Sequence, residues 1–356
     1  MQKEETDKYL CLGLIPNFVL IKNSKIDLED FCIEKIDWIK FGSCFPDINL
    51  SQFVEYKYNK HPHFIVFGEI ADSPNKKFPE GGVSKKDGKT HILIPPFEFL
   101  NLGLDYFNRV VLLLNLFKHS SVPVFTSIAF FRCTTHNLGY LVKHISANIA
   151  MEDYIDWDDE CFHQYYWLKG DESKELIGFK KNIYSLLLKE EPSRNEKYLQ
   201  IAMEYFLEGC LKEANGNDEM AALDFIIGLE ALYLSDEQEL KYKFANRVAI
   251  LLGNETERKE FREYAEEVYK LRNKIVHGDL SRKDIREKLP STTSKHIGGK
   301  FYSIRELLRV SLIYFLSLHL NGLAKKNDIL QKIDSALLSN DDRDWIMWRR
   351  RRLTIR

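Results

Sequence analysis

The segment KLRNKIVHGDL, from Lys270 to Leu280, brings an arginine, an amide, a histidine and a glycine to the end of a predicted helix over 257–277. Upstream, apolar residues recur at steps of four, three and four and define one core-facing stripe: Tyr264, Val268, Leu271 and Ile275. Asn273 and His277 lie four residues apart and therefore share a face, while Arg272 lies one residue off the stripe. We expect these three polar side chains to converge on one patch.

Two interpretations of His277 remain open at this point. The negative end of a helix dipole favours an imidazolium by roughly 0.3–1 kcal/mol, so His277 can act only as a C-terminal residue that satisfies the dipole. Arg272 argues for a function, because a second cation is an unfavourable neighbour of an imidazolium unless an anionic ligand bridges both. The pattern therefore also fits an anion-binding site.

The composition is that of a soluble globular protein, with 44% hydrophobic and 29% charged residues over 356 positions. This length predicts two domains. Lys and Arg total 51 against 53 Asp and Glu, which gives a net charge of −2. No protein-wide positive field is available to hold nucleic acid, so any contact with RNA must be local.

The six cysteines are scattered, without a C-x-x-C pair or a Cys/His cluster at zinc-ligand spacing, and indicate buried thiols in a reducing cytoplasm. We predict neither a metal nor a cofactor. The first residues lack the pattern of a signal peptide. The apolar segment 307–323 contains Arg309, His319 and Asn321 and favours a buried helix over a membrane span. We therefore expect a cytoplasmic protein without membrane contact.

Residues 1–170 carry short β-type runs, which predict an α+β domain: NFVLIKN (17–23), HFIVFGEI (63–70), HILIPPF (91–97) and VPVFTSIAFF (122–131). The segment 102–119 is long enough for a helix that crosses this sheet. The segment 71–90 gathers Pro, Gly, Lys and Asp and is typical of a long surface loop. We assign this domain a recognition or sensor role.

Residues 171–340 change to helical periodicity and predict an all-α domain, followed by a basic tail over 341–356. The predicted helices lie near 172–189, 194–214, 217–234, 238–252, 257–277 and 303–322. We expect Asn217 or Asp218 to N-cap the third helix and Asp236 the fourth. Gly253 and Gly278 stand where left-handed C-terminal caps are expected.

The segment LRNKIVHG resembles the R-x4-6-H signature of the HEPN superfamily, with Arg272 and His277 at R-x4-H spacing. ALDFIIGLEALYL and KYKFANRVAILLG precede it in an order and spacing similar to the ApeA-like branch of HEPN domains. That branch also carries a glutamate and an arginine, here Glu230 and Arg247. The likeness covers about residues 195–322. It implies an all-α domain that dimerises so that both motifs face one cleft.

The resemblance also implies a metal-independent endoribonuclease with a role in anti-phage, abortive-infection defence. His277 would act as general base or acid on the ribose 2′-OH and the leaving oxygen, and Arg272 would stabilise charge on the scissile phosphate. Asn273 would hold the imidazole or the phosphate. RNA is then the substrate, the partner is a second copy of the chain, and a phage component or another protein would act as trigger at the N-terminal domain. A non-catalytic HEPN module that binds RNA or a protein is the alternative.

Two further groups have open interpretations. A glutamate within the apolar run IIGLEALYL must be paired if it is buried, so we favour an ion pair between Glu230 and Arg247 over a direct catalytic contribution. The tail places arginines after Trp345 and Trp348, and these arginines either contact single-stranded RNA or belong to a tail that packs on the bundle: Arg349, Arg350, Arg351 and Arg352.

Overall fold

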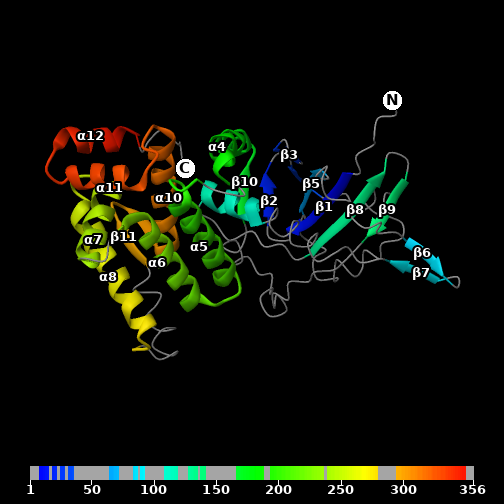
Figure 1. The fold of residues 1–356 in the computed structure, drawn as a ribbon, viewed down its shortest axis with the longest axis horizontal. Helices are drawn as coiled ribbons and strands as arrows, with labels where there is room; N and C mark the ends of the chain where they lie inside the picture. The colour runs from blue at the N-terminus through cyan, green and yellow to red at the C-terminus, as the bar shows by residue number, and fades with distance from the viewer. Residues whose placement is uncertain are drawn as a thin grey trace. The chain divides into compact units, whose positions relative to one another are not determined.

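The structure, a computed structural model, describes residues 8–15, 18–21, 25–28, 31–35, 64–71, 83–86, 89–92, 108–118, 127–134, 137–141, 166–187, 193–235, 239–279 and 294–349. The chain divides into two compact units. Met1–Val111 and Ser120–Gly178 form the first, and Leu112–His119 and Phe179–Arg356 form the second. Strands dominate the first unit and helices the second (Figure 1), so the predicted α+β class is confirmed at this level.

The first unit contains an antiparallel sheet with the strand order β3 (Lys25–Asp27), β4 (Phe31–Lys35), β5 (Phe64–Ala71), β1 (Lys8–Ile15), β8 (Ser127–Thr134), β9 (Asn137–Leu141). A parallel pair joins β2 (Phe18–Ile21) to β10 (Tyr166–Lys169). Strands were predicted correctly where β-branched and aromatic residues cluster, as in β2, β5 and β8. The central strand β1 was missed.

The segment 71–90, predicted as a surface loop or hairpin tip between strands, contains strand residues in its second half. Here β6 (Val83–Lys86) pairs in antiparallel fashion with β7 (Lys89–Ile92). The sequence carries the reason, since Asp87 and Gly88 separate the two strands and an Asp-Gly pair is a common signal for a two-residue hairpin turn. The lysines of these strands conceal that signal because β-strands are usually poor in lysine.

The six predicted helices are confirmed with small shifts at their ends: α4 (Glu172–Leu187), α5 (Lys197–Ala214), α6 (Asp218–Tyr233), α7 (Leu240–Leu252), α8 (Arg258–Val276) and α10 (Ile304–Leu320). The division between the two units falls within α4, after Gly178, and the other five helices belong to the second unit. Three further elements were not predicted, namely α11 (Lys326–Ser335), α12 (Asn340–Arg349) and the hairpin of β11 (Ser294–Ile297) with β12 (Lys300–Ser303). Figure 1 shows α11 and α12 at one end of the bundle, while α8 runs toward the other. Within the described residues, no helix is both long and apolar enough to cross a membrane.

The core of the helical unit forms where α6 meets α10. A Cβ on Gly228 would lie 2.7 Å from a methyl carbon of Leu308, so glycine lets these helices approach closely without a shift of that buried side chain. Tyr233 on α6 packs edge-to-face on Phe315 of α10, with ring centroids 5.2 Å apart. Its hydroxyl lies 2.9 Å from the Ser311 hydroxyl. This packing fixes the position of α6, which carries Glu230.

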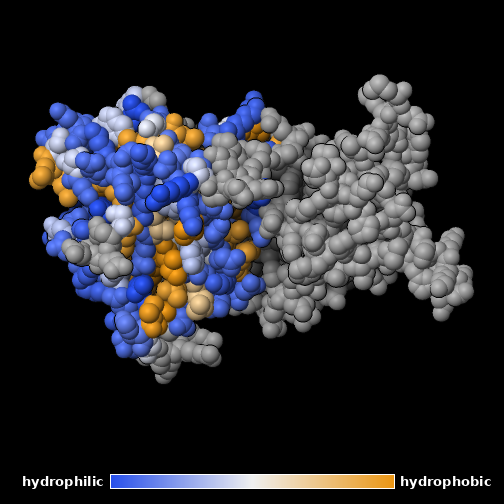
Figure 2. Space-filling view, viewed as in Figure 1, coloured by the Kyte–Doolittle hydropathy of each residue, from blue (hydrophilic) through white to orange (hydrophobic). Residues whose placement is uncertain are grey.

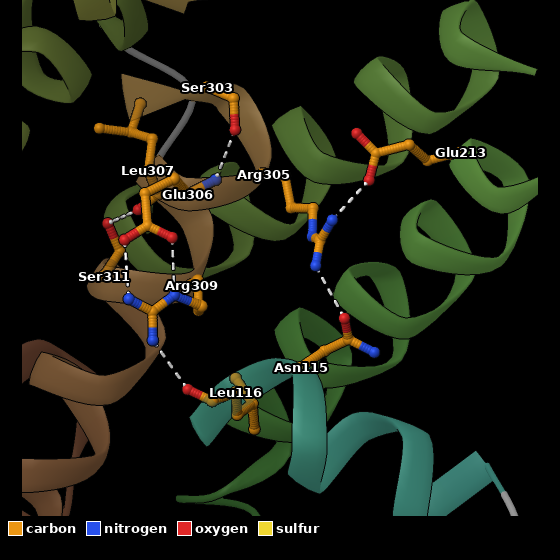
Figure 3. Close-up of polar contacts among 9 residues, drawn as sticks. All are labelled: Asn115, Leu116, Glu213, Ser303, Arg305, Glu306, Leu307, Arg309 and Ser311. Atoms are coloured by element: carbon orange, nitrogen blue, oxygen red, sulfur yellow. Dashed lines mark hydrogen bonds and ion pairs between the residues drawn. The ribbon is translucent and has the colours of Figure 1, made fainter. Parts of the chain in front are cut away.

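The predicted helix over 102–119 belongs in part to the helical unit and was assigned to the wrong domain. Residues 108–117 are helical, and Leu112–His119 cluster with the second unit. Two side chains of α10 hold this segment (Figure 3). Arg305 Nη2 donates to Asn115 Oδ1 at 2.8 Å, and Arg309 Nη1 donates to the Leu116 carbonyl at 2.9 Å.

Both arginines are buried, and their charges are compensated. Arg305 Nη1 lies 3.0 Å from Glu213 Oε2 on α5, and Arg309 makes a two-point contact with Glu306 at 2.6 and 2.7 Å. We call residues 112–119 the inserted segment, because they belong to the second unit although the chain on either side belongs to the first. Figure 3 shows both guanidinium groups near Asn115 and Leu116 of this segment. A buried cation without such partners would cost several kcal/mol, so the segment is an integral part of this core.

The predicted helix caps were partly wrong. Gly253 ends α7 with an extended backbone (φ −83°, ψ 137°), and its missing Cβ instead allows close approach to the Ala249 carbonyl. Glu239, not Asp236, is the N-cap of α7, and Asp236 lies outside the described residues. Asn217 occupies the predicted N-cap of α6 without a side-chain capping bond.

Candidate active site

Helix α8 ends as its sequence predicts. Tyr264, Val268 and Leu271 are buried, and Ile275 is half-buried. His277 is the C-cap, and Gly278 follows with φ +70°, a left-handed conformation that favours glycine. The amide of Gly278 bonds to the Ile275 carbonyl and the amide of Asp279 to the Lys274 carbonyl, the two bonds of a Schellman motif. The cap predicted at Gly278 is confirmed, and the imidazole stands on an exposed helix end.

Arg272 forms an ion pair with Glu230 on α6. Its Nε lies 3.3 Å from Glu230 Oε1, and the two side chains are 32% and 20% exposed. Arg272 Nη1 also donates to Asn273 Oδ1 over 3.4 Å, a long contact. Among the described residues, none accepts a hydrogen bond from Nη2. Glu230 thus holds the Nε edge of the Arg272 guanidinium, while Nη2 keeps its capacity to donate a hydrogen bond.

The environment of Glu230 opposes its ionisation. Burial raises the pKa of Glu230, and the positive charge of Arg272 acts in the opposite direction. The carboxylate is thus held beside its cation partly out of water, where their attraction is stronger than on an open surface.

The predicted ion pair between Glu230 and Arg247 is wrong. Arg247 instead contacts Asp334 on α11, with its Nε at 2.8 Å and its Nη2 at 2.7 Å from the carboxylate oxygens. Its Nη1 donates to the Tyr233 carbonyl at 2.6 Å. Arg247 therefore ties the end of α6 and α11 to α7. No sequence periodicity relates Arg247 to Asp334, which lies 87 residues further along the chain.

Asn273 contacts the arginine and not the histidine side chain. Its Oδ1 accepts from Arg272, and its backbone carbonyl accepts from the His277 amide at 3.0 Å. Among the described residues, none forms a hydrogen bond or an ion pair with the His277 imidazole. The Asn273 side chain thus lies beside Arg272, and within the described part of the chain no hydrogen bond joins it to the His277 imidazole.

The start of the predicted tail is a helix packed on the bundle. Ile346 of α12 is buried, Ser317 Oγ donates to the Arg349 carbonyl, and Arg349 Nη1 donates to the Asn321 carbonyl. The Arg349 guanidinium lies 4.7 Å from the ring centre of Trp345. Arg349 thus has a packing role, while Arg350, Arg351 and Arg352 lie outside the described residues.

An apolar stripe on α6 leads to Glu230. Met220 is 40% exposed, and Leu223 and Ile227 are half-buried at steps of three and four. The next position on this face is Glu230. Figure 2 shows apolar side chains gathered over the part of the helical unit where α6 and the end of α8 lie. Val276, at the end of α8, is 49% exposed.

No family model matches the sequence, and comparisons with curated proteins and with solved structures give no significant match. Within the described residues, no group of three or more His, Cys, Asp or Glu side chains is arranged to hold a metal ion. Sequence reasoning missed one residue of this region, Tyr269, which precedes Arg272 by one helical turn. Its spacing from Arg272 is the signal that could have identified it.

Proposed function

We propose that the protein is a metal-independent endoribonuclease with a HEPN-type site. The observation that carries this proposal is the end of α8, where an oriented arginine accompanies an exposed histidine. Arg272 supplies a cation for a phosphate, with Glu230 and Asn273 fixing its direction. His277 supplies an exposed imidazole, a side chain that can take up and release a proton during a reaction.

The reaction is an attack of the ribose 2′ oxygen on the adjacent phosphorus. His277 removes the 2′ proton, the new P–O bond closes a ring, and the bond to the 5′ oxygen breaks. Arg272 stabilises the negative charge that develops on the phosphate oxygens. The 5′ oxygen takes up a proton from the protonated His277 or from water, which gives 2′,3′-cyclic phosphate and 5′-OH ends. Because the nucleophile is the 2′-OH, DNA is not a substrate.

The partner in this proposal is a second copy of the chain, bound through the helical unit. The stripe of Met220, Leu223 and Ile227 on α6 supports it, because partly exposed apolar residues gain from burial in an interface. The stripe ends at Glu230, so a twofold axis near it would bring two Arg272 side chains to one cleft. The same proposal assigns the strand-rich unit to recognition of a phage component or another trigger in antiviral defence.

The test is cleavage of total cellular RNA by purified protein in EDTA, with sequencing of the new ends. We expect cyclic phosphate and 5′-OH ends. His277→Ala and Arg272→Ala should each lower the rate by roughly 10²-fold or more. His277 is exposed, so its variant should keep the wild-type melting temperature. Arg272→Ala also removes the ion pair with Glu230, so its rate is measured at a temperature at which the variant is shown to be folded. Arg262→Ala on the same helix and His296→Ala on β11 are matched controls that should retain activity.

A strict magnesium requirement or 5′-phosphate ends would contradict the mechanism. Wild-type protein that binds RNA without cutting it, with affinity that depends on Arg272, would instead identify the non-catalytic binding module.

A further inference from the structure

Tyr269 is anchored by its ring in the core of the helical unit. The residue is only 8% exposed, and its ring centre lies 5.9 Å from that of Phe244 on α7. Tyrosine side chains in such positions usually find a protein partner for the hydroxyl, because an unpaired polar group is costly away from water. Tyr233 follows this rule, since its hydroxyl contacts Ser311.

The Tyr269 hydroxyl does not follow that rule. It forms no hydrogen bond with any residue that the structure describes, and it keeps contact with solvent although the ring is buried. The side chain therefore presents a rigidly held donor at the surface, with the direction fixed by the packed ring. Such a group can bind a ligand at a small entropic cost, because little motion remains to be lost.

This hydroxyl belongs to the surroundings of the Glu230–Arg272 pair. Tyr269 and Arg272 are three residues apart on α8 and are therefore neighbours on one face. Burial and the negative charge of Glu230 raise the pKa of Tyr269, while Arg272 acts in the opposite direction. The hydroxyl consequently remains protonated at neutral pH and can donate a hydrogen bond.

We propose that the Tyr269 hydroxyl is a phosphate-binding donor, which acts together with Arg272 on one phosphodiester of an RNA strand. The proposal rests on the proposed function for the identity of the ligand, and it adds a residue to the site. Glu230 occupies the Nε edge of the guanidinium, which leaves a terminal nitrogen for the phosphate. A tetrahedral phosphate has several oxygens to satisfy, and a second fixed donor on the same helix face would orient it.

The experiment measures binding and cleavage separately in the full-length chain. Binding uses a short oligoribonucleotide with 2′-O-methyl groups throughout, which lacks the nucleophile, followed by fluorescence anisotropy. Cleavage uses the unmodified RNA. Tyr269→Phe removes only the oxygen and keeps the ring, so the melting temperature should not change.

Two tyrosines provide matched controls. Tyr242→Phe removes an exposed hydroxyl on the neighbouring helix α7 and should change neither property. Tyr233→Phe removes a buried hydroxyl that bonds to Ser311, so it should lower the melting temperature while the binding constant of the folded protein stays the same.

We expect Tyr269→Phe to weaken oligonucleotide binding roughly tenfold to a hundredfold, the range for a hydrogen bond to a charged group. The rate constant kcat/KM should fall by at least the same factor. Equal affinity of Tyr269→Phe and wild type overturns this inference, whether or not RNA is cleaved. Absence of cleavage together with Tyr269-dependent binding overturns the proposed catalysis and supports the binding role. Wild type that does not bind the oligonucleotide overturns the binding role.

Discussion

At the scale of single residues, the orientation of Arg272 depends on the Glu230 carboxylate, whose partner cannot be read from helical periodicity alone. Glu230 stands in the apolar run of α6, and sequence reasoning correctly required a partner for it. The partner was assigned wrongly because two arginines, Arg247 and Arg272, were available and pairing between helices has no sequence period. The contact at 3.3 Å selects Arg272.

Glu230 should make stability depend on pH in a defined direction. Its folded pKa is raised by burial, so its stabilising contribution is fully present below its unfolded pKa and is lost as pH rises through the folded pKa. The difference in unfolding free energy, wild type minus Glu230→Gln, should therefore decrease from pH 4 to pH 7. Urea unfolding of both proteins at several pH values measures it. A difference that increases over this range would show that Arg272 outweighs burial.

At the scale of elements, the long amphipathic helices were predictable and the short ones were not. The apolar stripe of α8 predicted the helix, and the glycine at position 278 predicted where it ends. By contrast, α12 alternates acidic, basic and aromatic residues without an apolar stripe, and only Ile346 is buried. The hairpin of β11 and β12 was hidden in a segment whose Gly298 and Gly299 also fit a loop.

The inserted segment 112–119 could not be assigned from periodicity, because its anchors lie about half a chain away in sequence. Asn115 and Arg305 are 190 residues apart. Replacing Asn115 with Leu would remove the Oδ1 that accepts a hydrogen bond from the buried Arg305 guanidinium, so we expect a loss of about 1–3 kcal/mol in unfolding free energy. Urea unfolding measures this loss, and Asn182→Leu on the exposed side of α4 is the control. Equal stability of the Asn115 variant and wild type would mean that the segment is not needed by the bundle.

At the scale of the whole molecule, the residues proposed to act on RNA all lie in the helical unit. The helical unit combines periodic sequence, tight packing at Gly228 and a polar cluster at the end of α8. A site of this kind on one chain offers one arginine and one histidine. In a twofold arrangement each motif would meet its own copy, so two of each would line a common cleft.

Subunit mixing tests whether that common cleft is required. Wild type is mixed with an equal amount of the Arg272→Ala/His277→Ala variant, subunits are allowed to exchange, and cleavage is measured at fixed total protein. Random pairing leaves about one quarter of the dimers fully wild type and about one half mixed. If the cleft needs both motifs, activity should fall to about one quarter of the wild-type value, since mixed dimers are inactive. Activity near one half, with exchange verified by pull-down of differently tagged chains, would mean that each protomer cuts alone. The groups around one Arg272, including Glu230 and Tyr269, would then have to complete the site within a single chain.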